Sequence, residues 1–226
     1  MLSFAAAMAI AATGLSACRT NVGVAGRVDG HGISESTVHG YLVDAGPTAK
    51  GVASLVDQAG NPVPPKNIVL NVLVESQALT RILDTTTGGV PSDATLAGLH
   101  DKAASTLLGA TETGAQLDTD ISKSFADDGL RVRFLAAYLR NLELEQAVID
   151  RVSAKSVADL AKAAAAAGVA VSVNPAYGAW VAASFSVVGP NSKGSTLPNF
   201  LTLAARTGQA VAPSPAATAP STPAGG

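Results

Sequence analysis

The chain has 226 residues, a formal net charge of −2 and an isoelectric point near 5.9. This balance of charge offers no basic stripe for phosphates and argues against nucleic-acid binding, and a single Cys excludes an internal disulfide framework and a multi-Cys zinc site. A charged fraction of only 14% with abundant Ala favours helices that bury little area per residue, within one domain.

The first segment, residues 1–17, carries no charge, and its run from Phe4 to Leu15 is almost entirely apolar. This run is too short to span a bilayer and has the length of a signal-peptide core. The four residues 15–18 (LSAC) are similar to a bacterial lipobox, in which small residues admit a peptidase and the Cys18 thiol accepts a lipid.

The lipobox resemblance implies a signal peptide over residues 1–17 and a mature chain that begins at Cys18. Cys18 would carry a diacylglycerol and a palmitate-type acylated amine, and residues 18–21 would form a tether. Two or more acyl chains hold a protein stably on a membrane. We therefore expect a protein anchored on the extracytoplasmic face of the cell membrane; an ordinary signal peptide or a buried free Cys is the alternative.

The mature chain opens with an extended pattern. Residues 22–28 are a strand candidate, residues 29–32 a turn in which two Gly supply positive φ, and Ile33 continues the extended segment. Ser34 is a good N-cap for a helix that ends at residues 46–47 (GP). The apolar face of this helix is predicted to consist of Val38, Tyr41, Leu42 and Ala45.

Apolar residues at helical spacing then dominate the chain. They predict helices over roughly 65–86, from Ser92 through Leu96, Leu99 and Ala103, over 111–127, over 128–151 and over 154–167. Pro65 suits a first helical turn, and Gly88 and Gly168 suit helix ends. The helix over 128–151 shows the strongest stripe, formed by Val132, Leu135, Leu139, Leu142 and Ile149. Asp127 and Asp128 are expected near its N-terminal dipole.

A second extended segment follows the helices. Val169, Val171 and Val173 alternate with small residues at a period of two, which predicts a strand paired with residues 22–28. Tyr177 and Trp180 are expected to anchor the core. Residues 185–188 suit a short edge strand, and the polar, Pro- and Ala-rich residues 189–226 suit a disordered tail. The fold class is therefore mainly α (α+β), in one domain over residues 22–188.

Three segments together resemble the SurA N-terminal domain of actinobacterial cell-envelope lipoproteins, over about residues 18–183. They are residues 25–34 (AGRVDGHGIS), 88–94 (GGVPSDA) and 171–180 (VSVNPAYGAW). The family motif maps onto Val173, Asn174, Pro175, Tyr177, Gly178 and Trp180, with Ala176 where the family usually has Arg.

The resemblance implies an extracytoplasmic chaperone-like protein, mostly helical, whose terminal segments pair while its helices cradle non-native or assembling polypeptides of the envelope. The residues after Trp180 are too few and too polar for the prolyl isomerase domain of larger relatives. The alternative function is a structural lipoprotein that docks one specific partner. The simplest interpretation of most apolar helix faces is an ordinary helical core.

Candidate chemistry is sparse. His31, His39 and His100 lack ligand-spaced companions, and no phosphate loop or nucleophile elbow is present. The carboxylates of Asp118, Asp120, Asp127 and Asp128 lack the spacing of a calcium loop and suit helix starts. We therefore predict no catalytic residues, no cofactor and no metal.

Overall fold

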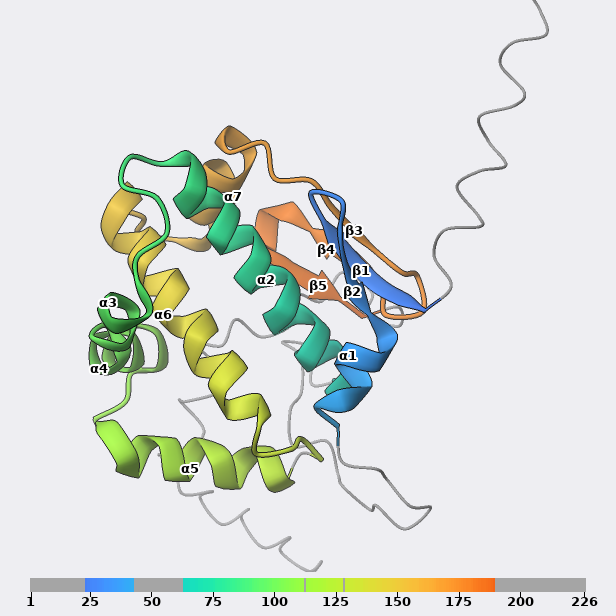
Figure 1. Cartoon of the computed structure of the whole chain (residues 1–226), viewed down its shortest axis with the longest axis horizontal. Helices are drawn as coiled ribbons and strands as arrows, with labels where there is room; N and C mark the ends of the chain where they lie inside the picture. Colours follow the sequence, from blue (N-terminus) through green and yellow to red (C-terminus); the bar gives the residue numbers. More distant parts are fainter. Residues whose placement is uncertain (1–22, 43–62, 112, 128, 190–226) are drawn as a thin grey trace, which may run out of the picture.

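The structure is a computed structural model that describes residues 23–42, 63–111, 113–127 and 129–189. The predicted signal peptide, Cys18, the tether and most of the predicted tail lie outside these ranges. The described residues are mostly helical with small antiparallel sheets, as the mainly α (α+β) prediction required (Figure 1). Within these ranges, every helix is too short or too polar to cross a membrane.

Strands β1 (Val24–Val28) and β2 (His31–Ser34) form an antiparallel hairpin. Its turn consists of Asp29 and Gly30, with φ values of 49° and 82°. Two successive residues with positive φ make the tight turn that matches strand twist. The predicted four-residue turn was therefore too long, because Gly32 already lies in β2 opposite Arg27.

Helix α1 (Glu35–Gly40) begins as expected, with Ser34 Oγ accepting from the Thr37 N–H at 3.0 Å. The prediction that it continues to residues 46–47 was wrong. The backbone carbonyl of Tyr41 accepts from the Arg131 N–H at 2.8 Å, and Leu42 forms a β-bridge with Leu130. These distant bonds take the backbone groups that a longer helix would need.

The two long helices, α2 (Pro65–Thr85) and α6 (Phe134–Val152), lie side by side and form the centre of the core (Figure 1). Pro65 occupies the first turn of α2, as predicted. The predicted start of α6, at residue 128, was wrong, because α6 begins at Phe134. Gly129 before it has φ 74°, and Val132, which was assigned to the apolar stripe, is 62% exposed.

Short helices join α2 to α6. They are α3 (Asp93–Ala97), α4 (His100–Ala103), the π-helix η1 (Ala104–Leu108) and α5 (Gly114–Asp127). The single helix predicted after Ser92 is interrupted at Gly98, a poor helix former, although Ser92 caps α3 as expected. Asp127 ends α5 and does not open the next helix, because residues 129–133 form the intervening turn.

Helix α7 (Val157–Ala166) leads through Gly168, with φ 68°, into β3 (Val171–Val173). Strand β3 pairs antiparallel with β1, so the sheet order is β2-β1-β3. Gly26 lies opposite Val173 and Val28 opposite Val171. The predicted pairing of the two terminal strands is confirmed.

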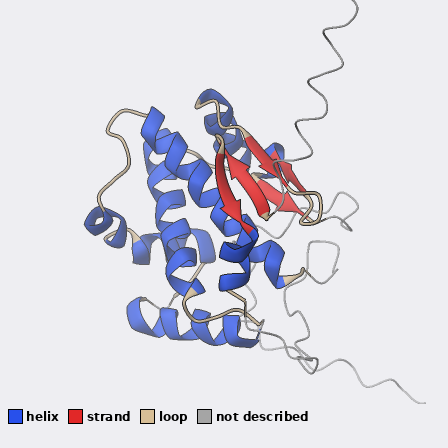
Figure 2. Ribbon diagram, turned by 45° about the vertical axis from the view of Figure 1, so that its right-hand side comes forward, coloured by secondary structure: helices blue, strands red, loops and turns tan. Residues whose placement is uncertain are grey.

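A second ribbon consists of β4 (Ala179–Val181) and β5 (Ser186–Val188), with the 3-10 helix η2 (Ala182–Ser184) between them. The strands gather on one side of the helices (Figure 2). Strand β5 was predicted and β4 was not. Tyr177 is buried in the core as expected, whereas Trp180 in β4 is partly exposed and packs edge-on against Phe185.

Candidate binding groove between the ends of three helices

The motif residues clasp the C-terminal turn onto β1. Asn174 donates from its backbone N–H to the Ala25 carbonyl at 2.9 Å and from Nδ2 to the Val24 carbonyl at 3.2 Å. Its Oδ1 accepts from the Ala176 N–H at 3.0 Å, which closes the turn that contains the exposed Pro175. Val173 continues the pairing with β1. Asn174 therefore connects both ends of the described chain.

Two further motif residues hold this turn against the core. The Tyr177 carbonyl accepts from Asn67 Nδ2 at 2.7 Å, and the Lys66 ammonium lies 5.1 Å from the centroid of the Tyr177 ring. Gly178 has φ 117°, and a Cβ built there would lie 1.8 Å from the Val188 carbonyl oxygen, so only Gly fits. Through these contacts, the motif residues stabilise the fold.

A ladder of buried polar side chains runs along α2. Asn67, Asn71 and Glu75 follow one another at a spacing of four and are at most 7% exposed. Asn71 Oδ1 accepts from the buried Val187 N–H at 2.6 Å, and its Nδ2 donates to Glu75 Oε1 at 2.7 Å. Glu75 Oε2 accepts from Asn141 Nδ2 of α6 at 3.2 Å. The ladder thus connects α2 to β5 and to α6.

The carboxyl groups beside this ladder have perturbed proton affinities. Burial, together with the nearby Glu145 charge, raises the pKa of Glu75 well above its usual value despite hydrogen bonds from Asn71 and Asn141. Burial raises the pKa of Glu145 to about 7. These residues were not predicted as a site from the sequence, although Asn67, Asn71 and Glu75 are spaced by four on an otherwise apolar helix face.

A second cluster connects three helices. His100 Nε2 of α4 lies 3.2 Å from Asp118 Oδ1 of α5, and His100 Nδ1 lies 3.8 Å from Glu143 Oε1 of α6. Burial raises the pKa of Glu143, and the His100 charge opposes this shift. His31 and His39 are exposed elsewhere. Within the described ranges, no group of three or more acidic, His or Cys side chains, this cluster included, is arranged so that it could hold a metal ion.

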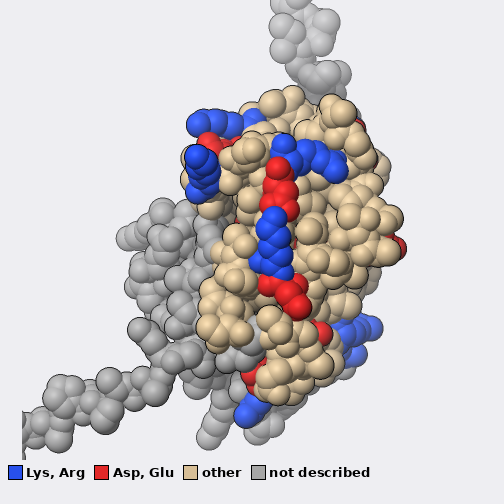
Figure 3. Space-filling view, turned by 90° about the vertical axis from the view of Figure 1, so that its left-hand side faces the viewer, with Lys and Arg blue, Asp and Glu red and all other residues tan. Residues whose placement is uncertain are grey.

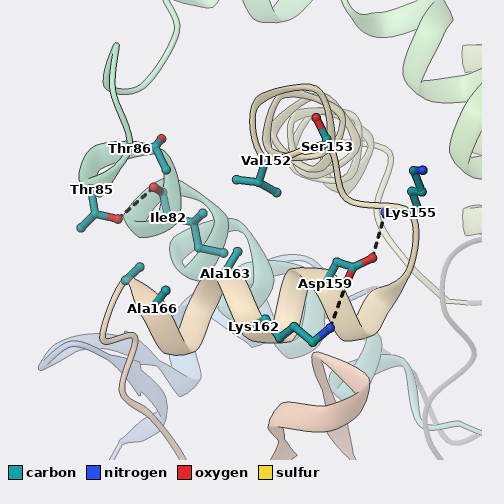
Figure 4. Close-up of a pocket in the computed structure, with 11 residues that line it drawn as sticks. Ile82, Thr85, Thr86, Val152, Ser153, Lys155, Asp159, Lys162, Ala163 and Ala166 are labelled. Carbon is teal, nitrogen blue, oxygen red and sulfur yellow. Dashed lines mark hydrogen bonds and ion pairs between the residues drawn. The ribbon is translucent and has the colours of Figure 1, made fainter.

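One candidate site for a ligand is an open groove of about 630 Å³ between the C-terminal ends of α2 and α6 and one face of α7 (Figure 4). We call it the helix-end groove. Its apolar lining residues are Ile82, Val152, Ala163, Ala166 and Ala167. Its polar lining residues are Thr85, Thr86, Ser153, Lys155, Asp159 and Lys162. Small Ala side chains on α7 leave the space open.

The helix ends make the shape of this groove. Thr85 Oγ1 donates to the Ile82 carbonyl at 3.0 Å at the end of α2, and Ser153 turns the chain at φ 52° after α6. Ser156 then caps α7 by accepting from the Asp159 N–H at 3.3 Å. The short connection at residues 153–156 therefore returns the chain so that one face of α7 lies beside the ends of α6 and α2.

The charge on the rim is unequal. Asp159 Oδ2 accepts from the Lys155 N–H at 3.1 Å and from Ser156 Oγ at 2.9 Å, and these bonds lower the pKa of Asp159. Lys162 reaches back to Asp159 Oδ1 at 3.4 Å, whereas the Lys155 ammonium points away from this carboxylate (Figure 4). The rim therefore carries two positive side chains, Lys155 and Lys162, and one negative side chain, Asp159, whose oxygens are already hydrogen-bonded, so its net charge is positive.

A different pattern covers the side of the molecule where α3 and α4 lie. Among the described residues, acidic and basic side chains alternate there in a column (Figure 3). Lys102 Nζ of α4 lies 2.6 Å from Asp150 Oδ1 of α6, and Arg140 Nη2 lies 2.9 Å from Asp93 Oδ1 of α3. These ion pairs connect α3 and α4 to α6 and leave both positive and negative side chains at the surface.

Comparison of the chain with protein-family models finds no match, and comparisons with curated proteins and with solved structures find none either.

Proposed function

We propose that this protein is a lipid-anchored extracytoplasmic protein that binds non-native or assembling polypeptides of the cell envelope. The proposal combines the lipobox at Cys18, the resemblance to the SurA N-terminal domain and the helix-end groove. The groove carries the most weight, because it is open and places apolar side chains beside polar ones at the ends of α2 and α6. It needs no catalytic group to perform this function.

The chemistry of the groove suits a polypeptide segment with exposed apolar side chains. Val152, Ala163 and Ala166 offer apolar surface to such side chains. The hydroxyl groups of Thr85 and Ser153 and the rim ammonium of Lys155 offer hydrogen bonds to backbone carbonyls. Because backbone groups are common to all polypeptides, this combination favours many clients over one sequence.

The test is suppression of aggregation of a denatured client by the full chain carrying Cys18→Ser, which cannot be lipidated. The protein with an unaltered groove is expected to slow aggregation of the client at a near-stoichiometric ratio of protein to client. Ala166→Glu places a charge in the groove and should abolish the effect. Ala165→Glu changes the adjacent exposed residue of α7, outside the groove lining, and should retain it. Equal activity of both variants would refute the groove as the binding site.

The anchor has its own test. Cys18→Ser is expected to move the protein from the detergent phase to the aqueous phase in a partition assay, because removal of the lipid chains removes about 0.8 kcal/mol per buried CH₂. Unchanged partitioning would mean that the membrane attachment lies elsewhere in the chain.

The alternative function is a platform that docks one specific partner. The alternating charges on the side of α3 and α4 favour it, because a mixed pattern of charge selects a partner with the complementary pattern (Figure 3). Cross-linking in membranes followed by purification separates the two functions. Many unrelated proteins support polypeptide binding, and one stoichiometric protein supports docking.

A further inference from the structure

A second hollow, of about 700 Å³, lies against a different face of α2 from the helix-end groove. Its walls come from α2, from α6 and from the β1–β2 hairpin. Val28 and Leu144 line it and are 2% and 3% exposed, so they form an apolar floor. We call this hollow the hairpin pocket.

Two guanidinium groups line the hairpin pocket and keep unused donors. Arg81 Nε lies 3.3 Å from Asp29 Oδ2, and Arg140 Nη2 lies 2.9 Å from Asp93 Oδ1. Each Arg has five N–H donors and spends one nitrogen on its ion pair. Within the described part of the chain, the other N–H groups of Arg81 and Arg140 have no partner. A planar carboxylate is a matching ligand for such donors.

Two enclosed acceptors line the same pocket. Gln77 Oε1 is buried without a hydrogen-bond partner among the described residues. Asp29 Oδ2 is also buried without a hydrogen bond, because its contact with Arg81 is an ion pair that lacks hydrogen-bond geometry. The Asp29 side chain is held in place, since its Oδ1 accepts from the Ala170 N–H at 2.8 Å. A buried acceptor without a partner, such as Gln77 Oε1, is costly unless a ligand supplies a donor.

We propose that the hairpin pocket binds the α-carboxylate and the adjacent α-nitrogen of an apolar amino acid, either free or as the C-terminal residue of a peptide. Arg140 and Arg81 receive the carboxylate. Gln77 Oε1 and Asp29 Oδ2 accept from the α-nitrogen, and the apolar side chain rests on Val28 and Leu144. This assignment is independent of the helix-end groove, which lies elsewhere on α2.

The assay is isothermal titration of the full Cys18→Ser chain with N-acetyl-leucine, N-acetyl-leucinamide and free leucine. N-acetyl-leucine is expected to bind at least about tenfold more tightly than the amide, which lacks the carboxylate. Tighter binding of free leucine than of N-acetyl-leucine would identify a free amino acid as the ligand. The reverse order would identify a peptide C-terminus.

Variants assign the roles. Arg140→Gln and Gln77→Leu should each weaken N-acetyl-leucine binding about tenfold, because each removes one partner of the ligand. Gln77→Leu keeps nearly the same side-chain size, and Arg140→Gln keeps a polar side chain without the charge. Lys162→Gln, in the helix-end groove, should leave the affinity unchanged, and circular dichroism checks that all three variants fold. Equal binding of acid and amide, no binding of either, or unchanged affinity in Arg140→Gln or Gln77→Leu would overturn the proposal.

Discussion

Asn71 is a buried residue of α2 whose removal should be costly, because its side chain bonds both the backbone of β5 and the Glu75 carboxyl group. Asn71→Ala leaves the N–H of Val187, a residue with 0% exposure, without its acceptor at 2.6 Å. An unsatisfied buried donor costs about 1–3 kcal/mol. Loss of the 2.7 Å bond to Glu75 adds about 1 kcal/mol, since Asn141 still donates to that carboxyl group. We expect a total near 3 kcal/mol.

Differential scanning calorimetry measures this effect. For a domain of this size, about 3 kcal/mol corresponds to a fall in Tm of roughly 6–12 °C. Gln116→Ala is the control, because Gln116 is exposed and, among the described residues, its side chain bonds only Asp120, four residues along α5. The Tm of this variant should move by less than about 2 °C. If Asn71→Ala shifts Tm no more than Gln116→Ala, the buried ladder does not stabilise the fold as argued.

Three further predictions concern stability. The pKa of Glu145, which burial raises to about 7, means that the folded state binds more protons than the unfolded state between pH 4.5 and 7. The free energy of unfolding should therefore fall by about 2 kcal/mol as pH rises from 5 to 8, and urea titrations of Glu145→Gln should show a shallower fall. Gly178→Ala should lower the free energy of unfolding by on the order of 3–5 kcal/mol, because the new Cβ would overlap the Val188 carbonyl. Gly168→Ala, which has open space around it, should cost about 1–2 kcal/mol. Similar Tm values for the two variants would contradict the clash at Gly178. Phe185→Ala should lower the free energy of unfolding by about 3–5 kcal/mol, and Trp180→Ala by only about 2 kcal/mol, since Trp180 is partly exposed. Urea unfolding measures both values, and a larger loss for Trp180→Ala would contradict this prediction.

The sequence predicted those features that local chemistry decides. Alternating Val residues identified β3, Ser34 and Ser92 were recognised as N-caps, and Pro65 marked the start of α2. The pairing of β1 with β3 followed because a strand with one apolar face needs a partner. These signals lie within a few residues of the structure that they specify.

Features that depend on distant contacts were not predictable in the same way. Helix α1 stops early because Tyr41 and Leu42 bond to residues 130 and 131, which no local pattern reveals. The helix-end groove is assembled from the ends of α2 and α6 and one face of α7, which lie far apart in the sequence. The Ala residues of α7 that line it look in the sequence like those of any Ala-rich helix. The hairpin pocket likewise brings together Arg81 and Arg140, which lie on different helices.

The pairing of β1 with β3 is the central feature of the fold, because the resemblance and the proposed function both require that architecture. Val28 and Val171 are opposite each other at a position between the hydrogen bonds of the ladder, where the two Cα atoms of an antiparallel pair approach most closely. An NMR spectrum of the assigned protein should therefore contain a strong nuclear Overhauser effect between their α protons. Its absence, with both resonances assigned, would contradict the fold and the function that rests on it.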